Sequence, residues 1–98
     1  MTQIMSDKIM LLNNEPTHYC PGCKSLHMIW VNKPNEHTGA KWTFDGNYES
    51  PTFSPSINIQ SIGCHYFITD GMIQYCGDCK HEFNSKTIPL PNLPEWAL

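Results

Sequence analysis

The sequence has no long apolar segment. No run approaches the roughly 20 residues that a helix needs to cross a bilayer, and residues 1–10 lack the basic end and extended apolar core of a signal peptide. These absences exclude the membrane as a partner and predict a cytoplasmic protein.

Charge is also scarce. Charged residues make up 15% of the chain, the formal net charge is −3, and the six lysine and arginine residues are scattered. Because nucleic-acid affinity depends largely on basic groups that displace phosphate counterions, nucleic acid is excluded as a partner. We expect a protein partner or substrate.

The chain is short, and its core must be small. At 98 residues, 40% of them hydrophobic, it predicts a single domain over residues 1–98 that buries a modest fraction of its surface. Small domains of this kind commonly add a metal ion or disulfides, and five cysteines are present. The Pro-rich tail, residues 89–98, is expected to run extended over the surface.

Turn-forming residues recur every several positions, and no window favours a helix. Apolar runs bounded by such residues predict strands at residues 8–12, 26–31, 42–44, 65–69 and 72–76. The last two flank Asp70-Gly71, the strongest short hairpin signal in the chain. We predict an all-β fold with little helix, built as a small antiparallel sheet with a zinc-ribbon-like metal site.

The segment Pro51–Ile59 alternates polar and apolar side chains with the period of two that a half-buried strand shows. Its two prolines confine it to an edge or to a bulged strand, because proline donates no hydrogen bond to a ladder. The alternation puts Ser54 and Ser56 on the same face.

Two Cys-x-x-Cys turns, Cys20-Pro21-Gly22-Cys23 and Cys76-Gly77-Asp78-Cys79, provide four thiols. This spacing lets two thiolates converge on one tetrahedral ion, and disulfides do not persist in a reducing compartment. The pattern therefore predicts one structural zinc ion as the cofactor, held by residues of both turns.

A fifth thiol, Cys64, leaves the fourth ligand open. Counting back from a two-residue turn at Asp70-Gly71 places His65 opposite Cys76 and brings Cys64 toward Cys79. Neighbours on a strand point to opposite faces, so Cys64 and His65 cannot easily bind one ion. Either Cys64 or Cys76 completes the site.

Residues suited to acyl transfer surround the same hairpin. Ser54 or Ser56 can supply a nucleophile, His65 a base, and Asp78 or His81 a group that orients the imidazole. The residues alone equally allow a structural interpretation. In that interpretation the serines are solvated and shape a bulge, and His65 packs its ring against neighbouring side chains.

The remaining histidines have structural alternatives as well. His81 can be the zinc ligand if Cys76 is free, and His18 and His27, which bracket the first Cys turn, can serve as ligands or as groups that support ligands.

Several motifs together resemble one known family. These are Pro51-Thr52-Phe53-Ser54-Pro55-Ser56-Ile57, Cys64-His65-x-Phe67-Ile68-x-Asp70-Gly71-x-Ile73-Gln74-Tyr75, and Asp78-Cys79-x-His81. The chain is similar, from the first Cys turn to the Pro-rich tail, to a small domain-of-unknown-function family of bacteria and their phages. Members are sometimes labelled ammonia monooxygenase, which this chain does not support, because it has neither a membrane span nor a copper-type histidine cluster.

The resemblance implies a function and a site. Some members lie in bacterial operons for ubiquitin-like conjugation, where a serine-peptidase role has been suggested. When the motifs of the family are matched to this sequence, the resemblance implies Ser54 or Ser56 as nucleophile, His65 as base, and Asp78 or His81 as the orienting group. It also implies shared thiols at Cys20, Cys23, Cys64 and Cys79. The family usually has an aliphatic residue where this chain has Cys76.

Three functions follow as hypotheses. The first is a small zinc-stabilised serine hydrolase or peptidase, acting on ubiquitin-like conjugates or precursors. The alternative is a non-catalytic zinc-ribbon-like module of phage or bacterial origin that engages a host protein through its aromatic residues and tail. A catalytic metal ranks last, because sites made only of thiolates are usually closed and structural.

Overall fold

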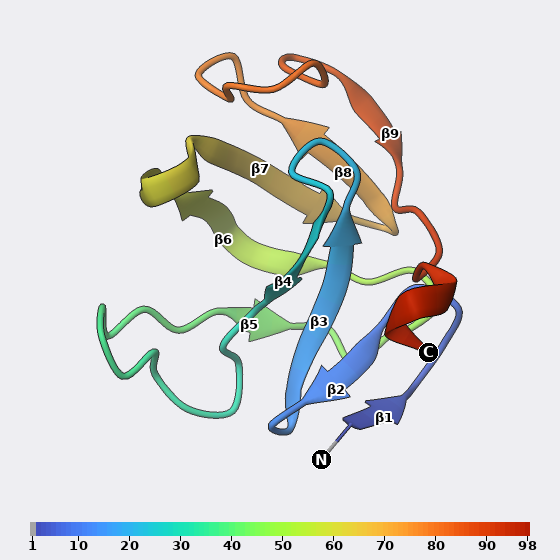
Figure 1. Ribbon diagram of the computed structural model, residues 1–98. Helices are drawn as coiled ribbons and strands as arrows, with labels where there is room; N and C mark the ends of the chain where they lie inside the picture. The colour runs from blue at the N-terminus through green and yellow to red at the C-terminus, as the bar shows by residue number, and fades with distance from the viewer. Residues whose placement is uncertain (1) are drawn as a thin grey trace.

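A computed structural model describes residues 2–98 of the protein (Figure 1). Met1, with which the expected domain begins, lies outside the described residues. These residues form two antiparallel sheets, and their only helical segments are two short 3-10 turns, η1 (Gln60–Ile62) and η2 (Glu95–Ala97). The prediction of an all-β fold is confirmed, with two sheets in place of the single one expected.

The first sheet is built from the N-terminal third of the chain. Its strands follow one another in the order β1 (Thr2–Ile4), β2 (Met10–Leu12), β3 (Glu15–Cys20) and β4 (Ser25–Met28). Asn13 and Asn14 form the turn between β2 and β3 with positive φ angles of 53° and 65°, which asparagine tolerates better than most residues. The first Cys-x-x-Cys turn joins β3 to β4 and so lies at one end of this sheet.

The second sheet, together with the segment between its strands β8 and β9, carries most of the predicted site residues. Its order is β5 (Thr43–Phe44), β6 (Phe53–Ile59), β7 (Cys64–Thr69), β8 (Met72–Tyr75) and β9 (Thr87–Pro89). Asp70 and Gly71 turn β7 into β8 with φ angles of 50° and 76°, the positive values that a two-residue hairpin of this type needs. The register pairs Thr69 with Met72, as predicted.

Strand β6 is bulged, as its prolines predict. It lies between β5 and β7, and its register with β7 shifts between Phe53 and Ile57. Beyond the shift, Ile57 faces Tyr66 and Asn58 faces His65. The irregular segment therefore ends at the point where Ser56 stands beside the hairpin.

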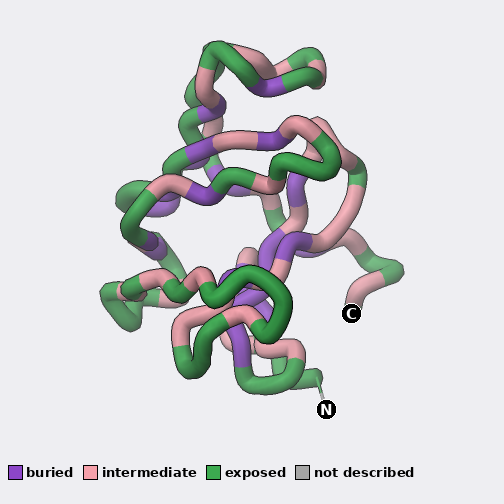
Figure 2. The backbone as a smooth tube through the Cα atoms, turned by 90° about the vertical axis from the view of Figure 1, so that its left-hand side faces the viewer, coloured by how far each residue is buried: buried purple, intermediate pink, exposed green. Residues whose placement is uncertain are grey.

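One core joins the two sheets. Its buried cluster contains Ile9, Cys20 and Ile29 from the first sheet or its loops, and Tyr66 and Tyr75 from the second. In Figure 2 the exposed segments lie mostly in the outer loops, and the buried segments lie mostly on the strands between them. The tail adds to this core: Leu90 and Leu93 are 1% and 6% exposed. Across residues 2–98, no helix has the length and apolar character to span a membrane.

Candidate catalytic triad and metal centre

Ser56, His65 and Asp78 form a continuous line of hydrogen-bonding groups. The Oγ atom of Ser56 lies 3.0 Å from Nε2 of His65, and Nδ1 of His65 lies 3.1 and 3.2 Å from the two carboxylate oxygens of Asp78. Each pair is within hydrogen-bond distance. The arrangement is that of a nucleophile, a general base and a carboxylate that orients the base.

The sheet explains why these three groups meet. Asn58 lies directly opposite His65, and residues two apart on a strand share a face, so Ser56 and His65 emerge on the same side. Asp78 follows β8, in the turn where the amide of Cys79 donates to the carbonyl oxygen of Cys76 at 3.2 Å. The side chains of His65 and Asp78 are 24% and 66% exposed, so a substrate can reach them from solvent.

The other two predicted catalytic residues lie elsewhere. Ser54 is exposed, and its carbonyl oxygen accepts a hydrogen bond from the Thr43 hydroxyl at 3.2 Å. No hydrogen bond joins Ser54 to an imidazole within residues 2–98. His81 lies in the cysteine cluster rather than beside Ser56.

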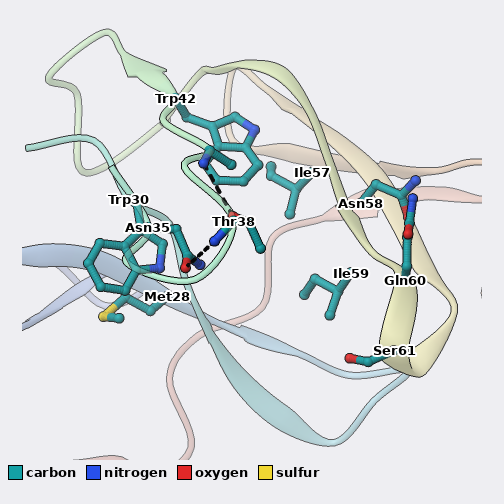
Figure 3. Close-up of a pocket in the computed structure, with 11 residues that line it drawn as sticks. Met28, Trp30, Asn35, Thr38, Trp42, Ile57, Asn58, Ile59, Gln60 and Ser61 are labelled. Atoms are coloured by element: carbon teal, nitrogen blue, oxygen red, sulfur yellow. Dashed lines mark hydrogen bonds between the residues drawn. The ribbon is translucent and has the colours of Figure 1, made fainter. Parts of the chain in front are cut away.

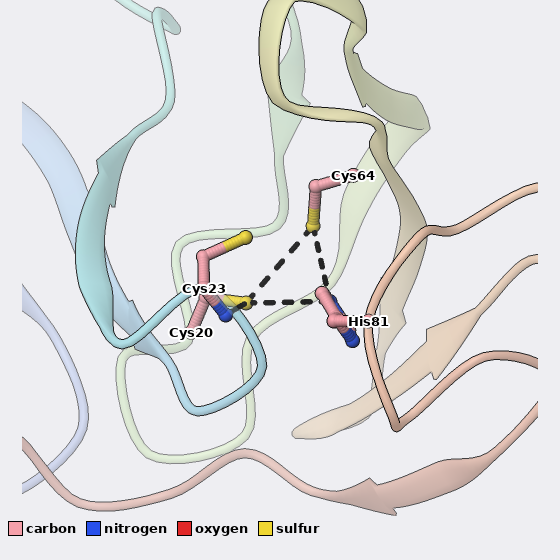
Figure 4. Close-up of side chains that lie close together, drawn as sticks. All are labelled: Cys20, Cys23, Cys64 and His81. Carbon is pink, nitrogen blue, oxygen red and sulfur yellow. Dashed lines mark hydrogen bonds between the residues drawn. The ribbon is translucent and has the colours of Figure 1, made fainter.

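Cys20, Cys23, Cys64 and His81 form a second, separate cluster (Figure 4). Their sulfur and nitrogen atoms all lie within 4.8 Å of one another, close enough for one metal ion to bind all four. The first two come from the β3–β4 turn, Cys64 begins β7, and His81 follows the second Cys turn, so the cluster joins both sheets. Three thiols and one imidazole match the donor set of structural zinc sites.

The remaining two predicted ligands differ in position. Cys79 is buried, and its sulfur lies 3.2 Å from Nε2 of His81, at the border of the cluster. Cys76 lies outside the cluster: its thiol is grouped with His65 and Asp78 instead. Of the two alternatives that the sequence left open, the structure therefore places Cys64 within the cluster and Cys76 outside it.

The pKa values of the thiols indicate how a bound cation would stabilise this cluster. All five cysteines are free, and the sulfurs of Cys20 and Cys64 are 4.0 Å apart. A hydrogen bond from Cys64 lowers the pKa of Cys20 to about 4, and the same bond raises the pKa of Cys64. Burial, reinforced by the charge on Cys20, raises the pKa of Cys23 to about 11. Further thiolates therefore need a neighbouring positive charge, which a bound metal ion supplies.

Gly22 makes room for the imidazole of this cluster. A Cβ atom built at Gly22 would lie 2.2–2.4 Å from three ring atoms of His81. The glycine in the first Cys turn is therefore a packing requirement, since any side chain here would displace His81.

His18 and His27 contribute to a different, buried network. The Tyr66 hydroxyl lies 2.7 Å from Nε2 of His18 and 3.0 Å from Nδ1 of His27. Burial, followed by the neighbouring His27, lowers the pKa of His18 to about 3, and burial lowers the pKa of His27 as well. Both rings are therefore neutral at pH 7 and serve as hydrogen-bonding partners of Tyr66 in the core.

A largely apolar pocket borders the strand that carries Ser56 (Figure 3). It has a volume of about 580 Å³, and its walls include Met28, Trp30, Trp42 and Ile59. It is connected to the triad in two ways. Asn58 lines the pocket and also faces His65 across the strands. The indole Nε1–H of Trp42 donates to the carbonyl oxygen of Ser56 at 3.1 Å.

Fold and site together define a class: a small all-β protein with a serine–histidine–aspartate arrangement of the kind that serine hydrolases use, and a separate Cys/His cluster that can hold a metal. The chain belongs to the BubE family, described as bacterial ubiquitination-like system serine protease, which it matches over residues 2–76. No curated protein sequence and no solved structure matches the chain.

The family match covers only part of the two sites. It includes Ser56 and His65 but ends before Asp78, Cys79 and His81. The structure is what places Asp78 against His65 and His81 against the thiols.

Proposed function

We propose that this chain is a serine peptidase that cleaves ubiquitin-like conjugates or their precursors, with Ser56 as nucleophile, His65 as general base and Asp78 as the orienting carboxylate. The observation that carries the proposal is the unbroken line from Ser56 Oγ through both ring nitrogens of His65 to Asp78. Membership of the BubE family supports the reaction class and the kind of substrate.

The proposed reaction proceeds through an acyl-enzyme. As Ser56 Oγ attacks the substrate carbonyl carbon, Nε2 of His65 takes its proton, and the Asp78 carboxylate stabilises the imidazolium that forms. His65 then gives this proton to the leaving amine or alcohol as the bond to the carbonyl carbon breaks. A water molecule, deprotonated by His65, releases the acyl group and restores the Ser56 hydroxyl.

We assign a structural role to the metal cluster, with Zn²⁺ as its ion and Cys20, Cys23, Cys64 and His81 as ligands. Four protein ligands fill a tetrahedral zinc site and leave no position for a substrate or for water. The ion would stabilise the junction of the two sheets. Cys64 precedes His65 on β7, so the same ligand would also hold the strand that presents the base.

The pocket beside β6 would hold part of the substrate. Its tryptophan and methionine walls favour an apolar side chain, whose burial contributes about 25 cal/mol per Å² of apolar area. A protein substrate could thereby place a peptide segment over Ser56, with one side chain between Trp30 and Trp42.

A fluorophosphonate probe tests the nucleophile. We expect the probe to label the protein, labelling to disappear in Ser56→Ala, and labelling to persist in Ser54→Ala, which removes the neighbouring hydroxyl of the same strand. Circular dichroism of each variant controls for folding. Labelling that is equal in Ser56→Ala and the parent protein, or absent from the folded parent, would overturn the proposal.

A second assay tests the substrate. A bacterial ubiquitin-like protein with a C-terminal extension should be cleaved by the parent protein and not by Ser56→Ala. Trp30→Ala should raise KM for this substrate while leaving the labelling rate with the small probe unchanged, because the probe does not need the pocket. An unchanged KM would show that the pocket has no part in binding.

A further inference from the structure

Cys76 stands beside the proposed base although it takes no part in the metal cluster. Its amide N–H donates to the carbonyl oxygen of His65 at 2.9 Å, which continues the β7–β8 ladder by one residue pair. Residues directly opposite each other in antiparallel strands present their side chains on one face. The thiol of Cys76 therefore shares the outer face with the imidazole of His65, while the adjacent Tyr75 points into the core.

Asp78 completes a group of three different donors. One atom each from His65, Cys76 and Asp78 lies within 4.8 Å of the other two. The group borders solvent, since His65 and Cys76 are partly exposed and Asp78 is exposed. An imidazole nitrogen, a thiolate and a carboxylate are the ligand types that Zn²⁺ takes, and three protein ligands leave an open position for water.

We propose that His65, Cys76 and Asp78 form a second Zn²⁺ site, distinct from the structural centre, and that its occupation inhibits the enzyme. The binding stands on the geometry alone. The inhibition rests on the proposed function, in which His65 is the general base.

The inhibition follows from the chemistry of imidazole. The mechanism proposed above requires the ring N–H of His65 on Nδ1, which faces Asp78, and a free lone pair on Nε2, which faces Ser56. A metal bound through the Nδ1 lone pair leaves the ring proton on Nε2. Nε2 then cannot accept the Ser56 proton, and Asp78 is held by the metal. Binding also releases the proton of the Cys76 thiol to solvent.

Cys76 is the residue that separates this proposal from the catalytic mechanism. It is assigned no catalytic role, so Cys76→Ala should retain the basal labelling rate. Without the thiol, only one imidazole and one exposed carboxylate remain, and zinc affinity should fall.

The first test measures binding directly. Protein that already contains one equivalent of zinc is titrated with Co²⁺, whose bond to a thiolate gives a charge-transfer absorption. We expect the parent protein to bind a further equivalent with this absorption, and Cys76→Ala to show only the background of exchange at the structural centre. Identical titrations of the two proteins would overturn the site.

The second test measures inhibition. Added Zn²⁺ should slow fluorophosphonate labelling of the zinc-loaded parent by about 100-fold or more, the contribution typical of a general base, and should leave Cys76→Ala nearly unaffected. Equal inhibition of both proteins, or of neither, would overturn the inhibitory role. A parent protein that is never labelled, even without added zinc, would count against the proposed function, while the cobalt titration would still decide the site.

Discussion

Cys64 and His65 are consecutive residues of β7 whose side chains belong to different sites. Sγ of Cys64 lies 3.5 Å from Nε2 of His81 in the buried cluster, whereas Nε2 of His65 lies 3.0 Å from Oγ of Ser56 on the outer face. The alternation of side chains along one strand therefore links the proposed metal centre to the proposed catalytic base. A change at the centre should be detectable at Ser56.

Removal of the metal should lower the melting temperature and slow labelling of Ser56. In small domains the binding free energy of a structural zinc ion is part of the folding free energy, on the order of 10 kcal/mol. Calorimetry with and without a strong chelator, under reducing conditions, measures the first effect, and the fluorophosphonate probe the second. A protein without bound metal by elemental analysis, with a melting temperature indifferent to chelators, would contradict the centre.

Gly22→Ala should weaken metal binding. The added Cβ would lie 2.2–2.4 Å from the His81 ring, so the imidazole must move away from the thiols. Gly77→Ala is the matched control in the second Cys turn, because its Cβ would have as its nearest contact only the Ser85 hydroxyl, at 3.5 Å. Competition with a chromogenic chelator measures both affinities. Equal affinities would show that His81 is not a ligand.

Asp78→Asn should reduce the labelling rate by about 10²–10⁴-fold, the range over which general-base catalysis contributes. Asparagine can keep a hydrogen bond to Nδ1 of His65 but cannot stabilise the imidazolium by charge. Asp70→Asn is the control: Asp70 has a φ of 50° in the hairpin turn, which asparagine also adopts readily. A labelling rate unchanged in Asp78→Asn would remove Asp78 from the triad.

The hairpin could be predicted from the sequence because its signals are local. Asp70-Gly71 specifies the turn, the turn specifies the register, and the register places His65 beside Cys76. The same register, with the alternation of faces, separates Cys64 from His65.

Strand β3 could not be predicted, because three of its buried side chains, Glu15, Thr17 and His18, are polar. Glu15 is 1% exposed, and its Oε1 accepts the backbone amides of Val31 and Asn32 at 2.9 Å. His18 finds its partner in Tyr66, 48 positions later. Such partners are distant in sequence, so the segment lacks the apolar pattern by which strands are predicted.

The choice between the two serines also depends on tertiary structure. Ser54 and Ser56 are two residues apart, so the alternation of side chains places both on the same face of the strand and does not distinguish between them. The register shift between Phe53 and Ile57 decides which hydroxyl reaches His65, and nothing in the local sequence gives its length.

The buried network around Tyr66 gives a prediction about stability. Tyr66 is fully buried, and its hydroxyl is the hydrogen-bonding partner of one nitrogen in each of two neutral rings, His18 and His27. Tyr66→Phe keeps the aromatic packing but leaves those two nitrogens without a partner in the core. An unsatisfied buried polar group costs about 1–3 kcal/mol. The free energy of unfolding should therefore fall by about that amount for each of the two imidazoles that cannot move to another hydrogen-bonding partner.

Tyr48→Phe is the matched control for this change. Tyr48 packs against Phe44 with 5.2 Å between ring centroids and is only partly buried, so loss of its hydroxyl should change stability little. Urea unfolding of the zinc-loaded proteins measures the change in the free energy of unfolding of each variant relative to the parent. Metal content is checked in each variant, because Cys20 lies two residues from His18. Equal stabilities of the two variants would mean that His18 and His27 obtain no net stabilisation from Tyr66. That result would leave the two buried rings explained by packing alone.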